Sequence, residues 1–320
     1  MTATDAGLPG TRRDRRPTQP VWEPAPVSQQ ILSAVLYLAG GALFFLLANL
    51  LLVTPVVHYA SQHNLYGELR LTLADGAIPV NSLDSAGKPT AAGTPIGLMK
   101  APGIGVRQEV IVEGSAAAQT AAGIGHRRDT VYPCQIGSSV LMARDGAYGG
   151  IGQRWKKLQP GDTFTVTMGQ GGCTYRVLDQ RTAGQNAPPP PSGTEGRLVL
   201  TTAAGLHYLP TDVVRVDAQL ITTGYKHALS SVPTAAVPEA EQAMGSQLRA
   251  ALKHEPGVDL ATPFGMILLL EVLVAAGIAT AWLWKRWGRW ETWIVSAPVL
   301  LTVGLLIAGQ AGLWFLPNLI

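Results

Sequence analysis

The stretch GIGHRRDTVYPCQIGSSVLMARDGAYGG, residues 123–150, decides how the central part of this chain is interpreted. It contains His126, which is flanked by glycine and arginine and looks like a catalytic base, and the apolar run VLMA, which leads to Arg144. Only residues 139–142 have the apolar, β-forming side chains that a buried strand needs, whereas residues 121–125 (AAGIG) are rich in glycine. The pattern therefore predicts a strand that leads to Arg144, and it places His126 in a solvated loop before that strand.

The same β pattern continues on both sides of this stretch. Short alternating or β-branched segments run from about residue 94 to residue 220, separated by turns rich in Gly, Pro and Asp. This spacing is typical of a sandwich or barrel. Residues 75–95 and the proline-rich residues 185–196 read as loops, and GGIGQRWKKL (149–158) leaves room for one short helix.

Three apolar runs flank or follow this β region, and each is long enough to cross about 30 Å of hydrocarbon. They are residues 29–57, 263–284 and 293–315, and Glu271 is the one charged residue within them. The first run is too long for a cleavable signal and follows a polar tail, so we expect an uncleaved signal-anchor. An ionisable group inside a span is a functional candidate by default. Glu271 also has simpler explanations: it faces the other spans, pairs with Gln310 or is protonated.

The basic residues set the expected orientation in a plasma membrane. Arginines gather in the tail 1–28, which we expect to be disordered, and the short loop 285–292 is also basic. Both should be cytoplasmic. Residues 58–225 would then form an extracytoplasmic β domain, joined to the second span by a linker, 226–262, with a helix near 238–254. Residues 316–320 would also lie outside.

Several classes of function find no support in the sequence. GIGVRQ lies between strand-like segments and is no nucleotide fingerprint, the six histidines have no metal-ligand spacing, and no basic stripe suggests nucleic acid. We therefore expect no cofactor, no metal and no nucleic-acid partner. The two cysteines, Cys134 and Cys173, lie in the expected external segment, where they either form a disulfide or remain as buried thiols.

The order of the β segments carries a resemblance. Six segments follow one another in the same order as in the sortases, which are membrane-anchored cysteine transpeptidases of Gram-positive bacteria. These segments are PIGLMKAPGIGVRQEVIVEG, residues 123–150, LQPGDTFTV, TYRV, LVLTTA and VVRVDAQL. The likeness covers about residues 94–220 and is greatest to actinobacterial sortases of the class E and F type. It implies an all-β barrel of about eight strands outside the membrane, in addition to the three transmembrane α-helices.

The resemblance also places the family's catalytic residues, and two of them are missing. The sortase cysteine closes a strand of the form Thr-Leu-x-Thr-Cys, and here residues 198–203 read LVLTTA, which puts Ala203 at that position. The histidine position falls on Arg144. The family arginine begins the last strand, near position 212 or 213, but Arg215 lies two or three residues further along, where a shift of two keeps the same sheet face.

These replacements favour a pseudo-sortase without catalysis. The expected peptide groove contains Arg144, Thr201, Thr202, Ala203 and Arg215, and its partner would be a sorting-signal-like peptide, a cell-wall component or another membrane protein. The alternative is an active transpeptidase or peptidase that uses Thr202 or Thr201 with His207, or His126, as non-standard residues. A purely structural role of the barrel, as a cap on the helices, is a third interpretation.

Overall fold

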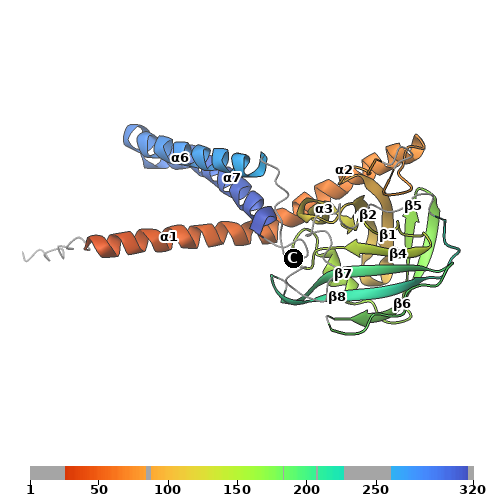
Figure 1. The fold of residues 1–320 in the computed structure, drawn as a ribbon. Coiled ribbons are helices and arrows are strands. Elements are labelled where there is room, and N and C mark those ends of the chain that lie inside the picture. Colours follow the sequence, from red (N-terminus) through yellow and green to blue (C-terminus); the bar gives the residue numbers. More distant parts are fainter. Residues whose placement is uncertain (1–25, 84–87, 183, 207, 227–260, 316–320) are drawn as a thin grey trace, which may run out of the picture. The chain divides into compact units, whose positions relative to one another are not determined.

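The computed structural model describes residues 26–83, 88–182, 184–206, 208–226 and 261–315. The chain divides into two compact units, Met1–Gly41 and Ala42–Ile320. The described part of the first unit is the beginning of helix α1 (Val27–Ala48), and all the other elements belong to the second unit (Figure 1).

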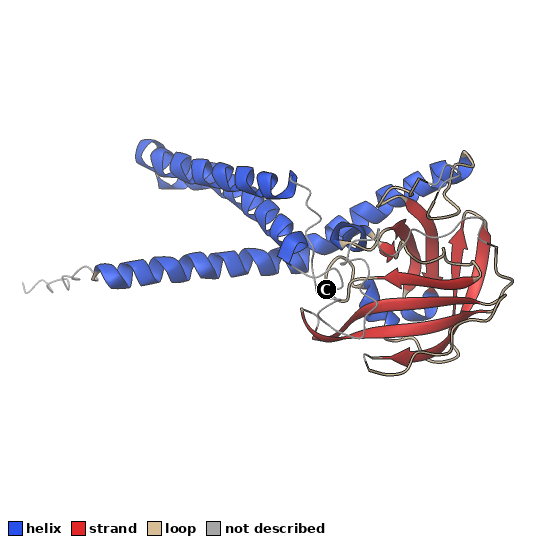
Figure 2. Ribbon diagram, viewed as in Figure 1, coloured by secondary structure: helices blue, strands red, loops and turns tan. Residues whose placement is uncertain are grey.

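Eight strands form a closed barrel in the order β1-β2-β3-β4-β7-β8-β6-β5, as the resemblance predicted (Figure 2). The strands are β1 (Pro95–Ala101), β2 (Val106–Glu113), β3 (Ile124–His126), β4 (Gly137–Met142), β5 (Thr163–Met168), β6 (Gly171–Arg181), β7 (Gly196–Leu206) and β8 (Leu209–Leu220). The pairs β2–β3 and β4–β7 are parallel, and the other neighbours are antiparallel. The β4 strand therefore ends beside the middle of β7.

The alternation of side chains explains the closed form. In β5, Phe164, Val166 and Met168 are buried while the residues between them are exposed, so one face of the strand lines the interior. The interior cluster includes these three side chains and Trp155, which comes from α4 (Ile151–Trp155). The short helix that the sequence predicted after β4 is therefore present, and it packs onto the core.

Two further short helices lie in the connections, η2 (Pro102–Ile104) and α3 (Ala117–Ala122). The α3 helix and the strand β3 occupy the stretch that the sequence suggested was a loop. The glycines of this stretch are compatible with a strand because space is short there: a Cβ on Gly125 would lie 2.7 Å from the Gly114 carbonyl oxygen.

The first helical segment extends further than the sequence predicted. The π-helical turn η1 (Asn49–Val53) and helix α2 (Thr54–Ala74) follow α1, so residues 58–74 are helical and do not belong to the strands. Gln62 fixes α2 to the barrel, because its amide accepts a hydrogen bond from the Val110 N–H (2.8 Å) and donates one to the Ala122 carbonyl (2.8 Å). The apolar run stops at Val57, but the helix does not.

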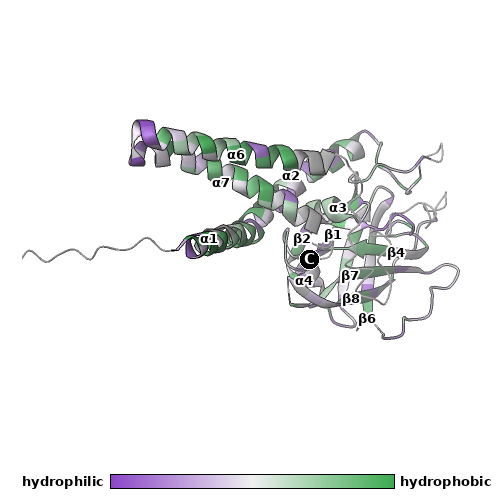
Figure 3. Cartoon of the chain, turned by 60° about the vertical axis from the view of Figure 1, so that its left-hand side comes forward, coloured by the Kyte–Doolittle hydropathy of each residue, from purple (hydrophilic) through white to green (hydrophobic). Residues whose placement is uncertain are grey.

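Two long helices end the described chain, α6 (Ala261–Trp287) and α7 (Arg289–Phe315). They pack against each other, and the expected loop 285–292 shortens to a turn at Gly288, whose φ is 105°. Three helical segments are long and apolar enough to cross a membrane: Val27–Ala74, Gly265–Trp287 and Arg289–Gly312. Figure 3 shows hydrophobic residues along all three. The expected helix 238–254, most of the tail 1–28 and the C-terminal residues 316–320 lie outside the described residues.

Candidate functional site

Strands β4, β7 and β8 bring most residues of the expected groove together, but Thr202 pairs with Val214 of the interior cluster and faces the other way. Met142 pairs with Thr201, and the Ala143 N–H donates to the Thr201 carbonyl at 3.1 Å, so Arg144 leaves β4 beside the middle of β7. Across the β7–β8 pair, Thr201 is opposite Arg215. Because side chains alternate along a strand, Ala203, two residues after Thr201, lies on the same face as Arg215. We call this surface the β4–β7–β8 face.

This face is closed. Val140, Met142, Val199, Ala203 and Val213 form a separate cluster of buried side chains on it. Ala203 is 1% exposed and Arg215 is 3% exposed. The methyl group of Ala203, which the resemblance places at the nucleophile position, is therefore covered.

Arg144, which the resemblance places at the base position, lacks the properties of a base. The residue is 1% exposed, and its guanidinium group donates to the Ala117 carbonyl at 2.9 Å and lies 4.9 Å from the centre of the Tyr148 ring. Burial lowers the pKa of Arg144 to about 10. The side chain thus remains charged near neutral pH and has no acceptor atom, so it cannot take a proton from a nucleophile.

The hydroxyl groups considered as replacements for the cysteine are also covered. Thr201 and Thr202 are both fully buried. Thr202 Oγ1 faces the first turn of α4, where a Cβ on Gly152 would lie 1.9 Å away. His207, which we considered as the base for Thr202, lies outside the described residues.

Arg215 lies among charged neighbours on β6 and β8. Burial is the main cause that lowers its pKa, and the nearby Arg181 lowers it further, whereas Asp217 and Asp212 raise it. Asp217 accepts a hydrogen bond from Arg181 Nε at 2.5 Å. Arg215 forms part of a buried charge network. By its pairing with Thr201, it faces the same sheet surface as Ala203, the face that a shift of two residues would keep.

The prediction that His126 is a solvated loop residue is wrong. His126 is fully buried and ends strand β3. Its Nδ1 lies 2.9 Å from Glu113 Oε2, and its Nε2 lies 3.0 Å from the Val131 carbonyl oxygen. A buried carboxylate on β2 therefore holds this ring, a partner 13 residues away that the glycine-rich local sequence did not suggest.

His126 also lies on the other side of the sheet from Ala203. It pairs with Leu141, whose side chain belongs to the barrel interior, whereas Val140 and Met142 face the opposite way. The Tyr132 ring, another interior residue, contacts His126 edge to face at 5.0 Å. His126 therefore has a structural place in the core and does not reach the β4–β7–β8 face.

Cys134 and Cys173 form a disulfide, with their Cα atoms 5.6 Å apart. It joins the loop before β4 to the beginning of β6, and the Cys134 N–H donates to the Tyr175 hydroxyl at 2.7 Å. Since the chain has two cysteines, neither is a free thiol. Among the described residues, no group of three or more His, Cys, Asp or Glu side chains gathers as a metal site.

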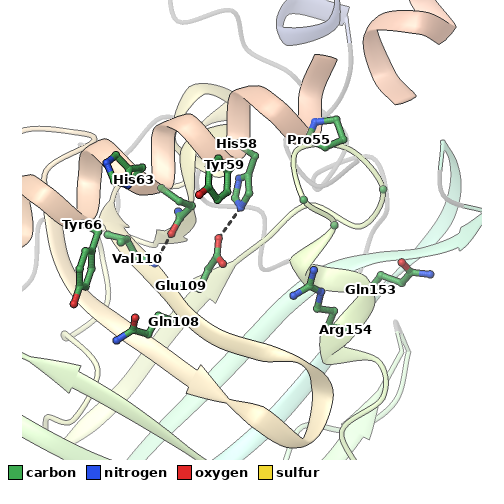
Figure 4. A pocket seen from close by; sticks show the side chains of 14 residues that line it. Pro55, His58, Tyr59, His63, Tyr66, Gln108, Glu109, Val110, Gln153 and Arg154 are labelled. Carbon is green, nitrogen blue, oxygen red and sulfur yellow. Dashed lines mark hydrogen bonds and ion pairs between the residues drawn. The ribbon is translucent and has the colours of Figure 1, made fainter. Parts of the chain in front are cut away.

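An open cleft of about 610 Å³ lies elsewhere on the barrel, and the sequence did not suggest it (Figure 4). Helix α2 forms one wall, β2 forms the floor at Gln108–Val110, and residues 146–154 form the other wall. His58 on α2 bonds Glu109 at 2.7 Å through Nε2, while its Nδ1 lies 3.2 Å from the Ala121 carbonyl oxygen. The cleft depends on the helical continuation at residues 58–74, which is why sequence patterns alone missed it.

Glu271 is exposed on α6, beside a shallow apolar groove that Ile267, Leu270 and Val274 help to line. The α6 side chains that are partly covered recur every three or four residues on another side of the helix, and they include Met266, Leu269 and Leu273. Glu271 therefore points away from that side.

Comparison with solved structures gives sortases. A sortase transpeptidase from Clostridium perfringens is 19% identical, with 52% of this chain and 99% of that chain covered and a TM-score of 0.41. Sortase A from Corynebacterium diphtheriae is 15% identical over 52% of this chain and 86% of that one, with a TM-score of 0.37. Sortase C of Clostridium perfringens, solved with a C-terminal cell wall sorting signal motif, is 19% identical over 55% and 89% of the two chains, with a TM-score of 0.37.

No protein-family model matches the chain, and no curated protein is similar to it.

Proposed function

We propose that this chain is a membrane-anchored, catalytically inactive relative of the sortases that binds an extended cell-wall or secreted polypeptide. The observation that carries the proposal is Ala203, a buried methyl group at the position where the family's strand pattern requires a cysteine. Without a nucleophile at this position, no acyl-enzyme can form there. The neighbouring base position holds Arg144, which cannot accept a proton.

The state of the β4–β7–β8 face supports the loss of chemistry. In an acyl-transfer site the reacting carbonyl must reach the nucleophile, the base and the oxyanion donor at the same time. Here Arg144, Ala203 and Arg215 are each at most 3% exposed. A substrate carbonyl has no access to these three side chains together.

The membrane arrangement belongs to the same proposal. Three apolar helices are available as anchors, and the arginines of residues 1–28 and the basic residues of 285–292 favour a cytoplasmic location for both segments. The barrel and the C-terminus would then lie outside the plasma membrane, as in a Gram-positive actinobacterial sortase of class E or F. A role as one subunit of a membrane assembly fits the same arrangement.

A covalent probe separates this proposal from an active enzyme. The full chain, purified in detergent, would be incubated with a sorting-signal peptide that carries a vinyl sulfone, and intact mass would be recorded. We expect no adduct, and we expect saturable binding of the same peptide without the electrophile in fluorescence anisotropy. An adduct that disappears in Thr202→Ala would establish the active alternative. Absence of binding to sorting-signal peptides and to cell-wall fragments would refute the proposed binding role.

A further inference from the structure

Strand β2 has an edge that the barrel does not complete. On one side it pairs with β1 from Val106 to Val112. On the other side it pairs with β3 only from Ile111 to Glu113. The chain before β3 is the helix α3, which cannot extend a ladder, so in the described part of the chain no strand covers this side of β2 before Ile111.

The middle of β2 lines the cleft and is irregular. Val110 directs its N–H away from β1, because that group donates to Gln62 Oε1 at 2.8 Å. Between the pairs Met99–Glu109 and Ala101–Val106 the β1–β2 register shifts, so Arg107 and Gln108 together oppose one residue of β1. A bulge of this kind leaves one residue unpaired with the neighbouring strand, and Gln108 is exposed and lines the cleft.

The cleft lies where a longer β3 would continue along the edge of β2. Its floor is β2, and its walls are α2 and the segment that follows β4 (Figure 4). The second wall approaches α2 through glycines, since a Cβ on Gly149 would lie 2.5 Å from the His58 ring. At about 3.3 Å per residue, an extended segment of about four residues spans the exposed edge.

The charges of the cleft favour a ligand with a carboxylate. Glu109 is the one carboxylate among the lining residues, and His58 engages it at 2.7 Å. Arg154 belongs to the wall formed by residues 146–154. Its Nη1 donates to the Gly105 carbonyl at 2.9 Å, and this bond fixes the guanidinium group beside the start of β2. His63 on α2 adds a second nitrogen base. A guanidinium group binds carboxylates well because it presents several N–H donors in one plane.

We propose that this cleft binds an extended polypeptide by strand addition to the open edge of β2 at Gln108, with a carboxylate of the ligand held by Arg154. Main-chain hydrogen bonds supply the affinity in this mode of recognition, and side-chain contacts supply the specificity. The site rests on the proposed function, because it is where that polypeptide binds. It replaces the closed β4–β7–β8 face as the binding surface.

The test uses the full chain in detergent and fluorescein-labelled tetrapeptides, with binding followed by anisotropy. Val-Glu-Val-Glu amide should bind saturably. The same peptide with N-methylated backbone amides should bind about tenfold more weakly, because it loses one or two net hydrogen bonds of about 1 kcal/mol each. This comparison needs no protein variant, so it does not depend on how a substitution affects folding.

Two further arms test the carboxylate. Arg154→Met should weaken the acidic peptide about tenfold and leave Val-Thr-Val-Thr amide unchanged, while Arg176→Met, an exposed arginine of β6, should change neither. A tetrapeptide with a free C-terminus and no acidic side chain shows which kind of carboxylate Arg154 prefers. The comparison is whether Arg154→Met weakens the binding of this tetrapeptide more or less than the binding of the acidic amide.

Equal binding of the N-methylated and unmodified peptides would refute strand addition, and so would a lack of saturable binding by all of these peptides. The failure of the site differs from the failure of the proposed function. If a sorting-signal peptide binds and Arg154→Met has no effect while Arg215→Met abolishes binding, the chain binds polypeptides but on the β4–β7–β8 face.

Discussion

Replacing Arg144 by methionine should stabilise the barrel. The Arg144 side chain is buried, with the residue 1% exposed, and burial lowers its pKa to about 10. A shift of that size means that keeping the charge in the folded state costs about 3 kcal/mol. Methionine has a similar length and no charge, and it gives up the hydrogen bond to the Ala117 carbonyl and the contact with the Tyr148 ring, each worth about 1 kcal/mol. The expected net gain is about 1 kcal/mol.

Thermal unfolding of the full chain in detergent, followed by near-UV circular dichroism, measures this gain. A domain of this size shifts by about 2–4 °C for each kcal/mol, so the midpoint of Arg144→Met should rise by about 2–4 °C. The exposed Arg176→Met serves as the control and should leave the midpoint unchanged.

The pH dependence gives a second check with a definite sign. The folded-state pKa of Arg144 lies below its unfolded value, so the cost of the charge is fully present below about pH 10 and is relieved as the pH rises from there towards the unfolded-state pKa. The advantage of Arg144→Met should therefore shrink in alkaline buffer. A variant that is less stable than the wild type at pH 7 would refute the reasoning and make Arg144 a structural residue.

Three other substitutions give distinct outcomes. The double change Cys134→Ala and Cys173→Ala opens a loop with a sequence separation of 39 residues, and by chain entropy it should lower the free energy of unfolding by about 4 kcal/mol in urea titration; a loss below about 1 kcal/mol would contradict this. His126→Ala removes the 2.9 Å contact of a buried carboxylate, which keeps only Arg128 at 3.8 Å, and should cost about 3 kcal/mol in the same assay, whereas an exposed loop histidine would cost almost nothing. The double variant Arg144→His and Ala203→Cys should stay unlabelled by the vinyl sulfone peptide while it is folded, because position 203 is only 1% exposed, and labelling of the folded variant would contradict the closed face.

The sequence predicts those parts of the fold whose signal is local. Alternation along residues 163–168 and the apolar run before Arg144 were enough to predict β5 and β4, and the room between Arg144 and Asp162 predicted α4. The three long apolar helices follow from composition in the same way. In each case the residues that form the element also carry the pattern.

The parts that the sequence missed depend on distant partners. Strand β3 has three residues, and it forms because β2 and β4 pair with its two sides. The glycine-rich sequence of this segment does not predict that pairing. His126 is buried because its ring contacts the Glu113 carboxylate, which is itself buried in the core. Helix α2 has a mixed composition after Val57, and His58 and Gln62 become recognisable as anchors only when Glu109 and Val110 lie opposite them.

The continuation of the first apolar segment into α2 also fixes the distance between the cleft and the end of the apolar run. At 1.5 Å per residue, Tyr66 at the far end of the cleft lies only about 14 Å along the helix axis from Val57, where the apolar run ends. If that run crosses the bilayer as we propose, the cleft lies within a short distance of the lipid headgroups. A polypeptide that is still held in the same membrane by its own anchor would then reach the cleft with a tether of a few residues, whereas a chain already released from the membrane would have to find it by diffusion. In that arrangement the helix would favour ligands close to the bilayer before any side chain contacts them.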